Sequence, residues 1–178
     1  ASDLHHGETI ISIGSEIEQV RSYIDILKFR YGDLIQAEFN IDETMTDYLI
    51  VKLVIQPLVE NSIYHGLQVK ENIHDKDRNL VSIRVYPENE GENSDIIIEV
   101  YDNGVGMPKN KIEKINSRLK NRSFVPEDSY GVYNVNERIK LYFGDAYGLQ
   151  YDGGVCEGTR AVIRIPRVDH YDEDLLQK

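Results

Sequence analysis

The sequence contains little cysteine and no long apolar run. Cys156 is the only cysteine among the 178 residues, which rules out an internal disulfide or a cysteine-cluster metal site and favours a reducing compartment. No apolar segment approaches the roughly 18 residues that a membrane span needs, and the N-terminus lacks the regions of a secretion signal. We expect a soluble piece without direct membrane contact of its own, which could still belong to a membrane protein.

Basic residues are also scarce relative to acidic ones. The chain has 20 Lys and Arg against 31 Asp and Glu, a formal net charge of -11, so nucleic acid would be repelled on average. With 40% hydrophobic and 29% charged residues, the composition predicts one globular domain. The expected organisation is an N-terminal extension over 1–14, a domain over 15–168 and an acidic tail over 169–178.

Helical and strand patterns are mixed without strict alternation. Apolar residues at three- and four-residue steps predict helices, and short β-rich runs predict strands. The expected helices cover 12–31, 46–67, 108–119 and 131–143, with Pro57 kinking the second or starting a new one, and the expected strands cover 34–41, 80–86, 95–101, 149–151 and 159–165. This pattern predicts an α/β fold, a two-layer α/β sandwich with a mixed, mainly antiparallel sheet.

The common nucleotide-binding loops are missing, but one glycine loop follows an apolar run. The chain has neither Gly-x-x-x-x-Gly-Lys-Ser/Thr nor an early Gly-x-Gly-x-x-Gly. Asp102-Asn-Gly-Val-Gly-Met107 instead places a carboxylate at a strand end, where it can accept a hydrogen bond from the exocyclic amine of a purine. Gly104 and Gly106 would let the backbone approach a ligand, although Asn-Gly is equally a hairpin signal.

Three further segments contain residues suited to a nucleotide. Asn61 and His65 lie four residues apart at the border of an apolar helical stripe, where an amide oxygen suits Mg²⁺ and an imidazole ring can lie against a base. Gly131 opens a helix whose free N–H groups would favour phosphate, and Thr159 follows a glycine at the start of a strand. Each segment alone could equally be a surface amide, a helix cap or an ordinary strand.

Taken in order, the four segments resemble the N, G1, G2 and final glycine-threonine boxes of the GHKL (Bergerat) ATP-binding superfamily. The helix before Gly32 and the segment 58–66 are similar to the YesM/LytS-type branch of bacterial sensor histidine kinases, and the resemblance covers 10–168. It implies that Asp102 receives the adenine amino group, that Asn61 binds Mg²⁺ and that His65 occupies the base-stacking position. It further implies a mobile ATP lid between Met107 and Tyr130. The remaining implied nucleotide contacts include Met107 and the two glycines that flank the lid hinge, Gly104 and Gly106. Gly131, Val132 and Asn134 would line the phosphates, and Thr159 would lie near adenine through a water.

Three positions depart from the family pattern. Ser129 replaces the first glycine of the G2 box, and Tyr64 stands where many relatives have a cation, leaving Lys109, Lys111 or Arg138 as possible substitutes. Pro57 occupies the position of the water-activating Glu of the ATPase branches, so hydrolysis is not the expected chemistry. Glu60, beside Asn61, is the candidate group for orienting or deprotonating an acceptor histidine, although it could be structural.

The resemblance therefore implies the ATP-binding catalytic domain of a two-component sensor histidine kinase. The enzyme would be a protein-histidine kinase using ATP and Mg²⁺, inactive alone because the phosphoacceptor His lies on an upstream helical segment that this chain lacks. Its expected partners are that helix and a response regulator, in a homodimeric full-length protein whose catalytic part is the cytoplasmic domain of a cell-membrane receptor. The alternatives are a GHKL serine kinase, a weak ATPase, or a degenerate nucleotide-binding interaction module.

Overall fold

The computed structural model describes residues 9–70, 79–123 and 130–169, with side chains except those of 65–70 and 130. Five strands form one sheet in the order β2-β4-β5-β7-β6. Their bounds are Ile35–Ile41 (β2), Asn79–Pro87 (β4), Ile96–Asp102 (β5), Gly148–Gly153 (β6) and Thr159–Ile165 (β7). Only β2 and β4 are parallel, and the other neighbours pair antiparallel. The expected mixed, mainly antiparallel sheet is thus confirmed.

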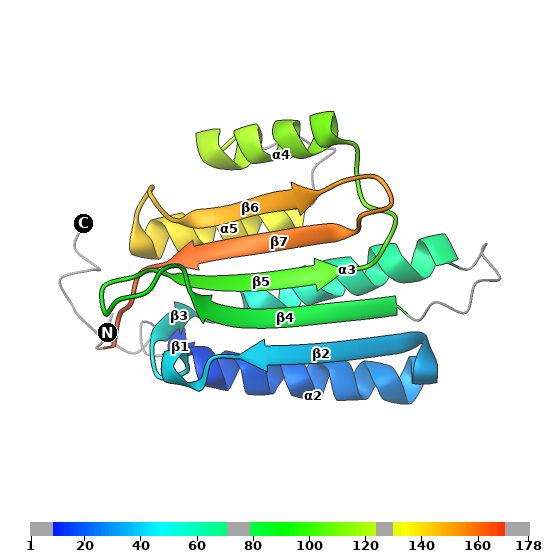
Figure 1. The fold of residues 1–178 in the computed structure, drawn as a ribbon, viewed down its shortest axis with the longest axis horizontal. Coiled ribbons are helices and arrows are strands. Elements are labelled where there is room, and N and C mark those ends of the chain that lie inside the picture. The colour runs from blue at the N-terminus through cyan, green and yellow to red at the C-terminus, as the bar shows by residue number, and fades with distance from the viewer. Residues whose placement is uncertain (1–8, 71–78, 124–129, 170–178) are drawn as a thin grey trace, which may run out of the picture.

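Helices cover one face of this sheet. Figure 1 shows α2 (Ile13–Tyr31), α3 (Ile55–Lys70) and α5 (Tyr130–Phe143) behind the strands, while α4 (Lys109–Asn121) lies alongside the edge strand β6. The apolar side chains of β5 alternate, so that Ile96, Ile98 and Val100 face the helices and are fully buried. Sheet and helices therefore form the two expected layers, with the core between them.

The helix before Gly32 has clear sequence causes. The Ser12 hydroxyl caps α2 by accepting a hydrogen bond from the Ser15 N–H (3.1 Å), and Gly32 ends the helix with φ +58°. Ile13, Ile17, Val20 and Ile24 bury one stripe at three- and four-residue steps. In the part of the chain that the structure describes, no helix is both long and apolar enough to span a bilayer.

The helix expected over 46–67 is partly wrong. Residues Leu49–Val51 form strand β3, which pairs antiparallel with β1 (Ile10–Ser12), and a 3-10 turn over Glu43–Met45 precedes it. Helix α3 begins only at Ile55, which puts Pro57 in its first turn, where a missing N–H breaks no helical hydrogen bond. The β-branched pair Ile50-Val51 is fully buried, and this tertiary pairing overrides the local helical pattern.

Candidate functional site

A cavity of about 850 Å³ opens at the carboxyl end of β5, between the sheet and helices α3, α4 and α5. Apolar side chains from the sheet and from all three helices contribute to its wall, together with polar side chains, of which two groups are described next. The lining residues are Leu58, Asn61, Ser62, Tyr64, Val100, Asp102, Gly104, Val105, Gly106, Met107, Lys111, Lys114, Ile115, Arg118, Leu119, Ser123, Val132, Tyr133, Tyr151, Thr159 and Ala161.

Asp102 and Thr159 form the first polar cluster. They are cross-strand partners, since Asp102 is the last residue of β5 and Thr159 the first of β7. The side chain of Asp102 continues the helix-facing series of β5, and its Oδ1 accepts a hydrogen bond from the Gly104 N–H (3.0 Å). A Cβ at Gly104 would lie 2.8 Å from that same oxygen, so a side chain there would displace the carboxylate.

The glycine loop after β5 rests against the turn between β6 and β7. Val105 accepts a hydrogen bond through its carbonyl from the Cys156 N–H (2.9 Å). Gly106 has φ +70°, and a Cβ there would overlap the carbonyl oxygen of Gly154. Only glycine fits this position, both for its backbone conformation and for the close approach of the two loops.

Tyr151 of β6 lines the cavity close to Asn61 and Asp102. Burial raises the pKa of its phenol, and the negative charge of Asp102 adds to this, whereas a hydrogen bond from the Asn61 side chain acts in the opposite direction. The sequence motifs missed Tyr151, although its inward position follows from the alternation of Leu149 and Tyr151 along β6.

The second polar cluster is a cationic row on α4. Lys111, Lys114 and Arg118 recur at steps of three and four residues, which places them on one helix face, and all three line the cavity. Of the three cations considered as substitutes at the sequence level, Lys111 alone belongs to this lining. Arg138 instead donates to backbone carbonyls of Leu53 and Lys52. Lys114 and Arg118 were not considered from the sequence, although their spacing from Lys111 by three and seven residues was an available signal.

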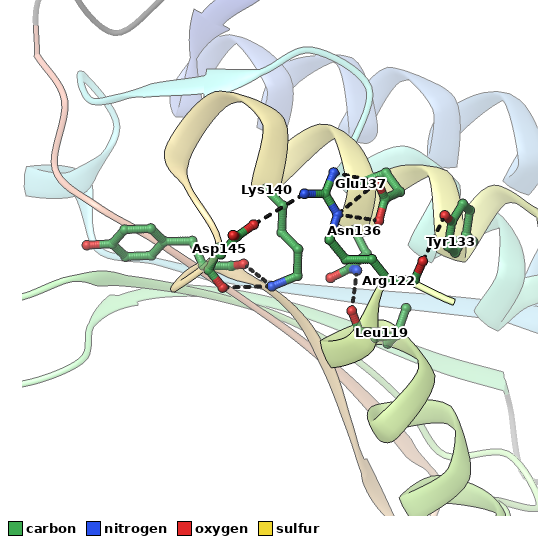
Figure 2. A network of polar contacts seen from close by, with 8 residues as sticks. Leu119, Arg122, Tyr133, Asn136, Glu137, Lys140 and Asp145 are labelled. Carbon is green, nitrogen blue, oxygen red and sulfur yellow. Dashed lines mark hydrogen bonds and ion pairs between the residues drawn. The ribbon is translucent and has the colours of Figure 1, made fainter. Parts of the chain in front are cut away.

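Two asparagine side chains attach α4 to the sheet edge. The Asn116 amide donates to the Tyr151 carbonyl (2.8 Å) and accepts from the Tyr151 N–H (2.7 Å), as a neighbouring strand would. Asn136 of α5, fully buried, donates to the Leu119 carbonyl (2.9 Å) and accepts from the Leu149 N–H (3.0 Å). Figure 2 shows Asn136 meeting Leu119 at the end of α4.

An ion-pair network holds the end of α4 from outside. Arg122, which ends the helix with φ +55°, pairs with Glu137 (2.8 Å) and Asp145 (3.2 Å), as Figure 2 shows. The hydrogen bond with Glu137 raises the pKa of the Arg122 guanidinium further. Residues 109–121, within the segment 107–130 expected as a mobile lid, form the helix expected over 108–119, and these contacts anchor it as a wall of the cavity.

The other expected site residues are dispersed. Met107 and Val132 line the cavity, whereas Gly131 and Asn134 are exposed at the start of α5 and are not among the lining residues. Glu60 is also exposed outside the lining, and it accepts a hydrogen bond from Gln56 one turn earlier (3.2 Å). The side chain of His65 and all of Ser129 lie outside the described residues.

Fold and cavity together define a small α/β sandwich domain with a ligand-sized cavity at the carboxyl end of β5. The family described as histidine kinase-, DNA gyrase B-, and HSP90-like ATPase matches residues 46–169, and the chain belongs to this family. The family is one of ATP-binding domains, and the resemblance drawn from the four sequence segments is confirmed.

Individual relatives agree with this membership. The chain is 32% identical to sensor histidine kinase YesM of Bacillus subtilis over 93% of its length, and 35% identical to sensor histidine kinase YpdA of Escherichia coli over 88%. It spans only about a quarter of either protein, 25% and 24% respectively. Among solved structures, the catalytic domain of histidine kinase ThkA superposes with a TM-score of 0.63 at 17% identity, covering 91% of this chain and 98% of that domain, which shows the shared fold.

Proposed function

We propose that this domain binds Mg-ATP in the cavity and presents the γ-phosphate to a histidine on another segment of a longer sensor kinase. The observation that carries the proposal is the distribution of polar groups in the cavity. One wall has a strand-end carboxylate next to a hydroxyl, and another has three cations. A ligand with an amine-bearing heterocycle at one end and a polyanion at the other complements both walls.

At the adenine end, Asp102 would accept a hydrogen bond from the exocyclic amine, with Thr159 beside it. The apolar wall supports this assignment, since Val100, Met107 and Ala161 line the cavity and offer apolar contact to a base. A charge-assisted hydrogen bond in such surroundings is stronger than one in water. The supporting loop is rigid on its inner side because Gly106 packs against Gly154.

At the phosphate end, Asn61 would bind Mg²⁺ through its amide oxygen. Within the described ranges, no group of three His, Cys, Asp or Glu side chains could hold a metal, so the ion would take its other ligands from phosphate and water. Bound Mg²⁺ would neutralise charge on the phosphate oxygens. Lys111, Lys114 and Arg118 would supply the positive charge that Tyr64 does not.

Phosphoryl transfer is favoured over hydrolysis by the start of α3. The water-activating Glu of the ATPase branches corresponds to Pro57, which has no group that can take a proton from water. Glu60 remains our candidate for orienting an incoming imidazole, since it is exposed on the helix that also carries Asn61. The phosphoacceptor helix, a response regulator and a homodimeric, membrane-attached whole protein with this domain on the cytoplasmic side belong to the same proposal.

The adenine assignment is tested by calorimetric titration of Mg-ATP into the wild type and Asp102→Asn. We expect the substitution to weaken binding roughly 10- to 100-fold, because a charge-assisted hydrogen bond is lost. Asp152→Asn is the matched control, since Asp152 also accepts a glycine N–H at a strand end (2.8 Å) but is exposed outside the cavity. Equal affinities for wild type and Asp102→Asn would remove the assignment.

The transfer step is tested separately. The upstream helical segment of the longer protein is supplied together with labelled Mg-ATP, and the labelled protein is treated with acid and with base. Label that survives base and is lost in acid identifies phosphohistidine, as we expect. An acid-stable label would support a serine kinase instead, and release of free phosphate without labelled protein would support an ATPase.

A further inference from the structure

The turn that begins α3 has an unfavourable backbone conformation. It joins β3 to α3 through Lys52, Leu53 and Val54, and Leu53 has φ +60° although it is not glycine. Non-glycine residues adopt this left-handed region rarely, and they keep it where surrounding groups impose it. The contacts around the turn are therefore the ones that fix its geometry.

Glu16 of α2 holds the N–H side of this turn. Its Oε1 accepts hydrogen bonds from the N–H groups of Val54 (3.0 Å) and Ile55 (3.2 Å), which α3 itself leaves without partners. Glu16 is 1% exposed, so its carboxyl group is buried at the positive end of a helix. The first turn of α3 is thus fixed to a different helix, 38 residues earlier in the chain.

Arg138 of α5 holds the carbonyl side of the same turn. One guanidinium nitrogen donates to the Leu53 carbonyl (3.0 Å) and another donates to the Lys52 carbonyl. The positive charge of Arg138 is also close enough to Glu16 to lower the pKa of that carboxyl group. We call Glu16 and Arg138 the α3 clamp, because together they bind both sides of the turn from two other helices.

The clamp lies at a distance from the cavity but acts on α3 and α5, two of the three helices that line it. Asn61 lies six residues after Ile55 on α3, and Val132 lies six residues before Arg138 on α5, so each is about 9 Å from the clamp along its helix. A tilt of α3 by about 6° at this turn would move Asn61 by about 1 Å, which exceeds the roughly 0.2 Å tolerance of a metal–ligand distance.

We propose that Glu16 and Arg138 are positioning residues for the metal–phosphate end of the nucleotide site. They set the orientation of α3 relative to α5, and with it the place of Asn61, whereas the Asp102 end is fixed by the sheet. The inference rests on the proposed binding of Mg-ATP. It predicts that loosening the clamp weakens Mg-ATP binding and leaves adenosine binding intact.

The test uses Glu16→Leu, which cannot accept the two N–H groups, and Arg138→Lys, whose single amine cannot reproduce the paired carbonyl contacts. Mg-ATP affinity is measured by calorimetry and adenosine affinity by NMR titration, on protein whose folding is checked by circular dichroism. We expect both variants to bind Mg-ATP on the order of tenfold more weakly, since displacements of 1 Å have effects of this kind. Adenosine affinity should change less than about twofold.

Three controls separate positioning from simple stabilisation. In Glu16→Gln the side chain can still accept hydrogen bonds from both N–H groups, so this variant should bind Mg-ATP as tightly as the wild type, unlike Glu16→Leu. Glu18→Leu changes the exposed carboxylate two residues away on the same helix, and Arg164→Lys changes an arginine paired with Asp95 across the sheet; both should bind like the wild type. If Glu16→Leu does not fold, Arg138→Lys with its control decides.

Equal loss of Mg-ATP and adenosine affinity in the clamp variants would overturn the inference, as would unchanged affinity for both. A wild type that binds adenosine but not Mg-ATP would instead refute the proposed function, and the two failures are distinguishable on that basis.

Discussion

Glu16 gives the domain a pH-dependent stability that can be measured. Burial raises the pKa of this carboxyl from an ordinary value of 4.5 to about 7, although the N–H groups of Ile55 and Val54 and the charge of Arg138 each lower it. The folded state therefore keeps a proton that the unfolded state has released. The contribution of Glu16 to the free energy of unfolding is full below pH 4.5 and is lost as the pH rises through about 7.

The size of the effect follows from the two pKa values. A tenfold change in proton affinity corresponds to about 1.4 kcal/mol, so the difference between 4.5 and about 7 corresponds to about 3.4 kcal/mol once both states are deprotonated. Between about pH 5 and pH 8 the loss is about 2.5 kcal/mol, because the unfolded state is already mostly deprotonated at pH 5.

The assay compares urea unfolding of the wild type with Glu16→Gln at several pH values in this window. Glutamine accepts the same N–H groups and does not titrate, so the difference in unfolding free energy between the two proteins isolates Glu16 from other groups. We expect this difference to shift by about 2.5 kcal/mol in favour of the glutamine variant as the pH rises. A difference that stays constant within about 0.5 kcal/mol would refute the reasoning.

Three further predictions concern the cavity and its walls. Asn136→Leu should lower the unfolding free energy by about 3 kcal/mol in urea, because two buried backbone groups lose their partners; a loss below about 1 kcal/mol would contradict this. Lys114→Glu should weaken Mg-ATP binding about tenfold in calorimetry, while Lys120→Glu, exposed on the same helix, should not; equal effects would remove the cationic wall from the site. Gly106→Ala should lower Tm more than Gly91→Ala, since both have positive φ but only Gly106 meets another backbone; equal shifts would mean that the contact is unimportant.

Much of the fold was predictable because its causes are local. The helix between Ser12 and Gly32 and the hairpin of β4 and β5 follow from caps, apolar spacing and turn residues. Strand β3 was not predictable in this way. Its three residues pair with β1, almost 40 residues earlier, and so short a segment contains no signal for such a distant partner.

The same distinction explains which parts of the cavity were foreseen. Asp102, its glycines and Asn61 line the cavity and belong to short motifs, which can be recognised directly in the sequence. The wall formed by α4 depends instead on Asn116 and Asn136, whose side-chain contacts reach 35 and 17 residues along the chain. An asparagine inside a helix has many surface roles, so its residue type alone does not predict that it replaces a strand neighbour. What the sequence left undetermined was therefore how firmly α4 is attached, and that attachment makes its cations part of a fixed wall.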